Sequence, residues 1–404
     1  MAAAVPVDLD LPGEIGRAFD DGVIDDEELL LLAELVDGDD IGIDGGDVDG
    51  GDVDGGNVDG GDVVVGEFGD VGDVVYLEGR YVPRWGRFNF DDWSDEECRV
   101  ETRFGKDDLR RLSRVLLLDD EIVCYNRTRC SSLEGLCLLL RRLVFPCRYV
   151  DLMAKFGRPK ATLCIIFNHM LKHVYDTFGH LLTSWDQPWL SRENLTFFSE
   201  CVEGRGAPLR NCWGFIDGTF RPTTRPELNQ RVMYNGHKRQ HGFKFQAISA
   251  PNGLIANFFG PLEGSRHDAY MLVQSCVLRE LEQHSFGVNG EVLCIYGDPA
   301  YPLSQHLQRG FHNPVGVDEQ QFNERMSRVR VSVEWSFGEI IEKYRFTDFK
   351  KMMKTGLSPV AKQYAVSTIF QNAHNCIYPA KCSQTFECPP PVLEDYFLAR
   401  RDEQ

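Results

Sequence analysis

The chain has 404 residues, 43% of them hydrophobic, and a formal net charge of −19. Its length and apolar content are enough for two or three domains with their own cores. No apolar run approaches the roughly 20 residues of a membrane span, and the N-terminus lacks the basic and apolar regions of a secretory signal, so we expect neither. The acidity is uneven. Residues 1–100 carry 29 acidic and 5 basic residues, a net charge of −24, whereas the remainder carries 33 acidic and 38 basic residues, a net charge of +5.

The first 75 residues read as a disordered acidic tail rich in Gly and Asp. A short amphipathic piece, Ile24–Val36, precedes a repeat of Gly-Gly-Asp-Val-Asp that runs from Gly45 to Val63 with one Asn at position 57. Glycine content and repulsion between like charges prevent such a segment from packing a core. The alternative is a calcium-binding turn array, but those arrays have a period of nine residues and this repeat has a period of five.

Thirteen cysteines are scattered without a Cys-x-x-Cys pair. Several are flanked by apolar residues, as Cys137 and Cys294 are. We therefore expect reduced, buried thiols in an intracellular protein. Cys376, Cys382 and Cys388 are evenly spaced but lack the tight pairs of a zinc site, and the sequence leaves their function open.

Residues 107–200 show helical periodicity. The expected helices are Leu109–Leu118, Ser132–Val144, Tyr149–Phe156 and Lys160–Phe178. The last two are joined by Gly157-Arg158-Pro159, so they form a candidate helix-turn-helix in which Lys160 and Lys172 contact DNA. An ordinary αα-hairpin explains the pattern equally well.

From residue 211 onward, strands alternate with helices. The expected strands are Cys212–Ile216, Gly242–Ala250, Gly253–Gly260 and Val292–Gly297, and the expected helices are Tyr270–Glu282 and Asn323–Tyr344. The Asn-Gly turn at 252–253 predicts an antiparallel pair of strands. The order of elements indicates an α/β domain with a mixed sheet.

Three acidic residues stand out in this region. Asp217 and Asp298 end apolar runs that read as strands, and Glu334 lies on the last helix, one turn after Arg330. Carboxylates held by rigid elements can bind two Mg²⁺ ions, the usual device for cutting or joining phosphodiesters. Taken singly, each acid also reads as a turn, cap or surface residue. An i,i+4 ion pair with Arg330 would hold the rotamer of Glu334.

Five motifs occur in order: Asp-Gly-Thr at 217–219, Tyr-Asn-Gly-His-Lys-Arg-Gln-His-Gly-Phe-Lys-Phe-Gln at 234–246, Gly-Ser-Arg-His-Asp at 264–268, Gly-Asp-Pro-Ala-Tyr-Pro-Leu at 297–303, and Arg-x-x-Val-Glu-x-x-Phe-Gly at 330–338. Together they resemble the PIF/Harbinger family of DDE transposases and its nuclease-like relatives. The resemblance covers about residues 211–345, with weaker helix-turn-helix similarity over 131–182.

The resemblance implies a ribonuclease-H-like catalytic domain that uses two Mg²⁺ or Mn²⁺ ions. The implied catalytic residues are Asp217, Asp298 and Glu334, and 35 residues separate the last two, a spacing often seen in such enzymes. Asp268 is implied as a fourth metal ligand or as a carboxylate beside the ligands.

The basic cluster His237, Lys238, Arg239 and Lys244 lies in the second motif, and we interpret it as a set of DNA phosphate contacts. A solvated hairpin edge is the alternative. Two positions depart from the family pattern, Phe220 after Asp-Gly-Thr and Trp335 after the last acid. Trp335 is a candidate for stacking on a base.

We therefore predict an acidic tail (1–75), a helical helix-turn-helix-like domain (76–205), a catalytic domain (206–375) and a C-terminal tail (376–404). The predicted activity is that of a metal-dependent DNA endonuclease and transposase, which cleaves transposon ends and joins the 3′-OH to target DNA. A non-catalytic DNA-binding or chromatin-associated protein on the same fold is the rival, and an RNA nuclease is a second. Relatives suggest a Myb-like partner protein, a homo-oligomer is a further expectation, and a DNA substrate implies a nuclear location.

Overall fold

The computed structural model of the protein describes residues 75–77, 80–82 and 86–398. The amphipathic segment Ile24–Val36 and the acidic repeat lie outside the described residues. The described part begins with an antiparallel pair, β1 (Val75–Leu77) and β2 (Arg80–Val82). No helix in the described part of the chain is long and apolar enough to cross a membrane.

Helices dominate the segment from residue 86 to 205. It contains α3 (Asp95–Thr102), α4 (Lys106–Val115), α5 (Ser132–Val144), α6 (Tyr149–Phe156), α7 (Lys160–Phe178) and α8 (Arg192–Gly204), the short 3-10 helices η1 (Phe90–Asp92), η2 (Gly179–Leu182) and η3 (Pro188–Leu190), and the antiparallel pair β3 (Glu121–Val123) and β4 (Arg129–Ser131). Ser131 caps α5 by accepting from the Glu134 N–H, as N-cap serines do. Gly157 ends α6 in the left-handed conformation, which glycine adopts without strain.

A mixed sheet follows. Its strands are β5 (Cys212–Pro222), β6 (Tyr234–Asn235), β7 (Gln240–Ser249), β8 (Ile255–Glu263), β9 (Cys294–Gly297) and β10 (Leu307–Arg309). They lie in the order β8-β7-β5-β9-β10, and β6 pairs with one end of β7. The pairs on one side of β5 are antiparallel and those on the other side are parallel. The first long strand thus occupies the centre of the sheet, which is consistent with the expected ribonuclease-H-like domain.

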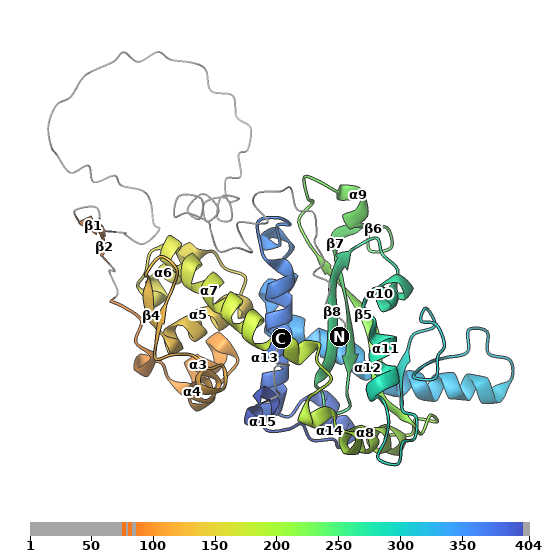
Figure 1. Cartoon of the computed structure of the whole chain (residues 1–404). Coiled ribbons are helices and arrows are strands. Elements are labelled where there is room, and N and C mark those ends of the chain that lie inside the picture. Colours follow the sequence, from red (N-terminus) through yellow and green to blue (C-terminus); the bar gives the residue numbers. More distant parts are fainter. Residues whose placement is uncertain (1–74, 78–79, 83–85, 399–404) are drawn as a thin grey trace, which may run out of the picture.

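The remaining elements include helices next to the sheet, and the first half of the long helix α12 projects away from it (Figure 1). They are α9 (Gln230–Met233), α10 (Asp268–Gln274), α11 (Val277–His284), α12 (Val317–Lys343), η4 (Arg345–Asp348), η5 (Lys350–Met352), α13 (Val360–Ile377), α14 (Lys381–Phe386) and α15 (Leu393–Phe397). The single helix expected over Tyr270–Glu282 is in fact two helices, because Cys276 takes a left-handed conformation with φ 53° between them.

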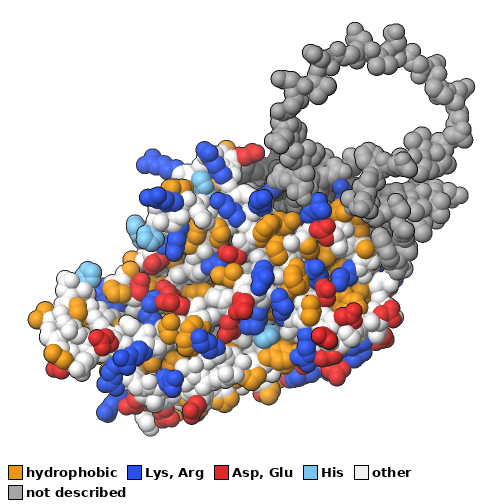
Figure 2. All heavy atoms as spheres, turned by 180° about the vertical axis from the view of Figure 1, so that it is seen from behind, with side chains coloured by type: hydrophobic (Ala, Val, Ile, Leu, Met, Phe, Trp, Pro, Cys, Tyr) orange, Lys and Arg blue, Asp and Glu red, His pale blue; other side chains and the backbone are white. Residues whose placement is uncertain are grey.

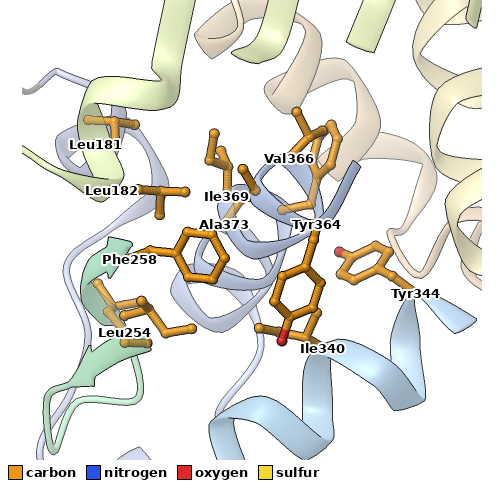
Figure 3. Close-up of a cluster of buried hydrophobic side chains, with 14 of the residues drawn as sticks. Leu181, Leu182, Leu254, Phe258, Ile340, Tyr344, Tyr364, Val366, Ile369 and Ala373 are labelled. Atoms are coloured by element: carbon orange, nitrogen blue, oxygen red, sulfur yellow. The ribbon is translucent and has the colours of Figure 1, made fainter. Parts of the chain in front are cut away.

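Helix α13 joins the two halves of the molecule. It stands between the helical segment and the sheet (Figure 1) and contacts α7 on one side and β8 on the other. Figure 3 shows its buried face, where Ile369 and Tyr364 meet Leu182 of η2, Phe258 of β8 and Tyr344 at the end of α12. The hydrophobic core is therefore continuous across the boundary expected near residue 205.

Buried amides fix α13 on the sheet. Asn372 accepts from the Ile255 N–H at 2.9 Å and donates to the Ile255 carbonyl at 3.0 Å, so its side chain pairs with β8 as another strand would. Asn375 donates to the Gly253 carbonyl at 2.8 Å. Residues after 376, set apart above as a C-terminal tail, form α14 and α15, which bury Leu393 and Tyr396 completely.

Candidate active site

Asp217 lies on the central strand of the sheet. Residues Cys212–Ile216 of β5 are buried on both sides, and the strand reaches a more open environment at Asp217, whose side chain is 17% exposed. Its Oδ1 accepts a hydrogen bond of 2.9 Å from the Gly218 N–H. The apolar strand thus holds a carboxylate at the edge of the core.

Asp298 reaches the same end of the sheet on the neighbouring strand. β9 runs parallel to β5, with Phe215 opposite Tyr296, and each aspartate lies two residues beyond that pair. Side chains two residues apart in a strand share a face, so the pairing directs both carboxylates to one side. Asp298 is half-buried, and its Oδ1 accepts from the Ala300 N–H at 2.9 Å.

Glu334 approaches from α12, which packs against β5. The connection runs through Arg330, whose Nη2 lies 2.8 Å from Oδ2 of Asp217 and whose Nη1 lies 3.5 Å from Oε1 of Glu334. The predicted i,i+4 pair between Arg330 and Glu334 is confirmed. Glu334 is 57% exposed, whereas Arg330 is only 19% exposed. The guanidinium is thus the buried partner, and it lies between two of the three predicted catalytic acids.

Asp268 completes the group of acids from the first turn of α10. A Cβ placed on Gly218 would come within 2.9 Å of Oδ1 of Asp268, so the carboxylate lies directly over the backbone next to Asp217. Lys244 of β7 donates to the same oxygen at 2.8 Å. A side chain at position 218 would therefore displace the Asp268 carboxylate from its place beside β5.

The environment of Asp217 favours the protonated form of its carboxyl group. Burial raises the pKa of Asp217 to about 6, and repulsion from Asp298 and Asp268 adds to the rise, against the lowering effects of Arg330 and of the Gly218 N–H. The site therefore holds more negative charge than its two cations, Arg330 and Lys244, neutralise. Burial and mutual repulsion of this kind are typical of functional carboxylate clusters.

Tyr301 is a site residue that the sequence analysis did not single out. Its side chain is fully buried, and its phenol pKa is raised by burial and then by Asp268, Asp217 and Asp298. Its ring packs directly against Gly297, where an added Cβ would lie only 2.7 Å from Cδ2 of Tyr301. The ring is therefore buried close to the acids. Its place in the Gly-Asp-Pro-Ala-Tyr-Pro motif is the sequence feature that could have identified it.

The donor chemistry of the site suits a hard divalent cation. All four side chains offer carboxylate oxygens, the ligands that Mg²⁺ and Mn²⁺ prefer. Among the residues that the structure describes, however, no group of three or more His, Cys, Asp or Glu side chains is close enough to hold an ion. Arg330 lies between Asp217 and Glu334, and Lys244 holds Asp268. The residues thus fit a metal by type, and these two ion pairs would have to open to admit one.

The predicted DNA-contacting residues fall into two environments. His237, Lys238 and Arg239 are exposed in the turn between β6 and β7. The pKa of His241 is lowered, first by burial and then by the nearby charges of Arg225 and Lys350. The basic surface therefore extends beyond the motif at 234–246. Figure 2 shows Lys, Arg and His side chains gathered at this end of the molecule. Lys244 is instead partly buried beside Asp268.

The candidate recognition helix α7 is largely buried. Its apolar residues pack against α5, α6 and α13. The ion pair of Lys172 and Asp176, at 3.0 Å, lies on its exposed side. Lys160 is half-buried at the first turn. The extensive burial of α7 agrees with the αα-hairpin alternative. A helix-turn-helix would contact DNA through the first turn of α7, where Lys160 lies.

Cys376, Cys382 and Cys388 do not form a metal site. All three thiols are free, and burial raises the pKa of Cys376 and of Cys382 to about 12. These thiols also do not belong to any group of three or more possible metal ligands in the part of the chain that the structure describes. Cys382 instead packs in the core and donates to the carbonyls of Ala250 and Pro251.

The segment of the chain that contains the acids matches a known protein family. Residues 216–372 match the family model described as DDE superfamily endonuclease. The matched range contains Asp217, Asp268, Asp298 and Glu334, most of β5 and all of the later strands of the sheet. It supports the DDE superfamily for this part of the chain and, with it, nuclease or transposase chemistry on DNA in general terms. No curated protein and no solved structure matches the chain.

Proposed function

We propose that this protein is a divalent-metal-dependent DNA endonuclease and transposase of the PIF/Harbinger type. The observation that carries the proposal is that Asp298 and Asp268 lie near Asp217 at one end of β5, and that Arg330 links Asp217 to Glu334, within a range that matches the DDE superfamily. A scaffold protein has no need to bury Asp217 beside Asp298 and Asp268, where burial first and then the two neighbouring acids raise its pKa. This disfavours the non-catalytic, chromatin-associated alternative.

In this proposal Asp217, Asp298 and Glu334 are the catalytic residues and, together with Asp268, the ligands of two Mg²⁺ or Mn²⁺ ions. Such ions activate the attacking water or 3′-OH and stabilise the leaving oxygen of a phosphodiester. Arg330 and Lys244 balance part of the negative charge of the acids. Tyr301 is fully buried next to these acids.

The DNA would approach across the exposed basic turn. His237, Lys238 and Arg239 project from the β6–β7 turn, and β7 leads from there to Lys244 and the acids. Cationic side chains in this position would bind phosphates without reading sequence. Lys160 and Lys172 on α7 are the second proposed DNA contact. The substrates would be transposon terminal repeats and target DNA in the nucleus, with a Myb-like partner and a homo-oligomer as further components.

A nicking assay tests this proposal. The substrate is DNA that carries the cognate terminal repeats, and Mg²⁺, Mn²⁺ and Ca²⁺ are compared. Asp217→Asn, Asp298→Asn and Glu334→Gln should each reduce nicking by several orders of magnitude while the protein stays folded. Asp186→Asn is the matched control, because Asp186 is exposed and lies on another segment. Nicking at the wild-type rate by all three active-site variants would show that the acids are not catalytic.

A further inference from the structure

A pocket lies beside the acids on a different face of α12. It has a volume of about 290 Å³ and lies where α12, α14 and the end of α8 meet. Its walls include Val331 and Trp335 of α12, Phe386 of α14, and the arginines Arg205 and Arg328. This volume is at the lower end of the roughly 300–1,000 Å³ of small-molecule sites. A single nucleotide fits such a space and a duplex does not.

Its two arginines carry unpaired charge. Arg205 and Arg328 are exposed, and within residues 86–398 the side chain of neither makes an ion pair or hydrogen bond. Glu203, two residues before Arg205, pairs with Arg210 instead. Glu324, one turn before Arg328 on α12, makes no ion pair with it within residues 86–398. Arg325, one turn before Arg328, adds a third positive charge and donates to the Gly206 carbonyl at 3.0 Å. Arginines without acidic partners beside a cavity favour an anionic ligand, and phosphate is the anion that their planar donors match best.

Trp335 gives the pocket an aromatic surface. The Nζ of Lys381 lies 3.9 Å from the centroid of the indole. Because Lys381 itself does not line the pocket, the indole presents a further surface there that the ammonium does not occupy. Flat aromatic surfaces flanked by cations are how proteins hold unpaired bases, with the base on the ring and its phosphate on the cations.

We infer that this pocket binds one unpaired nucleotide of a DNA strand, with the base stacked on Trp335 and its phosphate held by Arg205 and Arg328. The inference rests on the proposed function, since Trp335 directly follows Glu334 on α12. Successive residues on a helix differ by about 100° in direction and 1.5 Å in height. A strand that leaves the acids would therefore pass over α12 into the pocket. The site would hold a flanking nucleotide outside the cleaved bond and would fix the position of the strand.

Binding of a short single-stranded thymidine oligonucleotide tests the inference. Binding by the full chain is measured by fluorescence anisotropy in EDTA, so that no metal or catalysis is required. Trp335→Leu should weaken binding about ten-fold because a stacked base is lost, and Trp335→Phe should restore most of it. Arg328→Gln should weaken binding and lower the salt slope by about 0.7, the value for one phosphate contact in a single strand. Arg114→Gln on α4 removes the same charge elsewhere and should change neither.

A photo-cross-link locates the contact. An oligonucleotide with one 5-iodouracil should cross-link to Trp335 in the wild-type protein, as mapped by mass spectrometry. Loss of the cross-link in Trp335→Leu with unchanged folding supports the inference. Binding of Trp335→Leu and Arg328→Gln within about two-fold of wild type would overturn it, as would equal competition by free thymidine monophosphate, which would make the ligand a nucleotide and not a strand.

The two proposals fail separately. Asp217→Asn should abolish nicking but leave oligonucleotide binding in EDTA unchanged. If the wild-type protein nicks DNA but Trp335→Leu binds the oligonucleotide as well as the wild type does, the proposed function stands and the nucleotide pocket is wrong. If the protein binds the strand at Trp335 but does not nick DNA under any of the conditions tested, the pocket stands and the proposed catalytic function is wrong.

Discussion

Arg330 on α12 and Asp217 on β5 form an ion pair in which Nη2 lies 2.8 Å from Oδ2, with both side chains less than one-fifth exposed. The same guanidinium reaches Glu334 at 3.5 Å. One cation therefore ties the central strand to the helix that carries the third acid. It offsets repulsion among the acids, and it would have to move if Asp217 and Glu334 were to hold a divalent ion together.

Replacement of Arg330 by Gln should destabilise the protein in EDTA by about 1–3 kcal/mol, because a largely buried ion pair loses one partner. Addition of Ca²⁺ should then raise the melting temperature of Arg330→Gln by more than that of the wild type, since the ion replaces the missing positive charge. Calorimetry with and without Ca²⁺ measures both effects. Arg99→Gln, which breaks an exposed pair with Asp95, is the control. Equal Ca²⁺ responses of the variant and the wild type would contradict the role given to Arg330.

Replacement of Asp217 by Asn should change how stability depends on pH. Burial and neighbouring acids raise the pKa of Asp217 from 3.8 to about 6, so the folded state binds its proton more tightly than the unfolded state does. The wild type therefore loses stability as pH rises from about 4 to 6, by about 3 kcal/mol in total. The amide that replaces this carboxyl cannot ionise, so the stability of the variant relative to wild type should rise over this window and stay constant above it.

Denaturant unfolding in EDTA at several pH values between about 3.5 and 8 measures the difference. The comparison with wild type at each pH cancels the titration of other groups. Asp186→Asn, a substitution at an exposed position, should show no such window. A difference between Asp217→Asn and wild type that is the same at every pH would show that Asp217 is not held in a repulsive, buried environment.

The local parts of this fold could be predicted from the sequence. The bounds of α5, α6 and α7 are those expected from their apolar periodicity. In the structure, Ser131 caps α5, Gly157 ends α6 in the left-handed conformation and Pro159 precedes α7. The β7–β8 pair was expected from its Asn-Gly turn and is confirmed. The break at Cys276 was missed because the apolar periodicity continues through it and neither Gly nor Pro marks it.

Long-range contacts of the site could not be predicted in the same way. The pair of Arg330 and Glu334 follows from helical spacing, but the pair of Arg330 and Asp217 depends on how α12 crosses the sheet. Lys244 reads as a member of a basic cluster in the sequence, whereas β7 turns it toward Asp268. Side chains alternate between the two faces of a strand, so Lys244 points to a different face from the residues on either side of it. The sequence alone does not show which face of β7 lies toward the acids.

Replacement of Asn372 by Leu should destabilise the helical segment and the sheet domain together. The change leaves the N–H and carbonyl of Ile255 buried without partners and removes a contact of 3.0 Å with the Tyr396 hydroxyl. Two unsatisfied buried groups predict a loss of about 2–5 kcal/mol. Because α13 shares its core with α7 and β8, the variant should still unfold in one transition by circular dichroism and by tryptophan fluorescence. Ile369→Val, expected to cost about 1 kcal/mol, is the control, and separate transitions would show two independent domains.

Removal of residues 1–74 should tighten DNA binding at low salt. This segment contains 23 acidic residues and one basic residue, Arg17, and the exposed basic turn around Lys238 offers an opposite charge. The tail would therefore compete with DNA for that surface. Screening weakens the competition as salt rises, since the Debye length falls from about 30 Å at 0.01 M to about 10 Å at 0.1 M. The truncated protein should bind duplex DNA several-fold more tightly at about 0.02 M salt, and the advantage should disappear near 0.3 M.

A full-length variant separates charge from chain length. In it, six aspartates of the repeat are changed to Asn: Asp47, Asp49, Asp52, Asp54, Asp59 and Asp62. It should bind DNA with an affinity between those of the wild type and the truncated protein, because its net charge lies between theirs at unchanged length. Fluorescence anisotropy across a salt titration measures all three proteins, with their melting temperatures as a check on folding. Identical affinities at every salt concentration would remove the tail from DNA recognition, because an electrostatic competitor must act most strongly where screening is least.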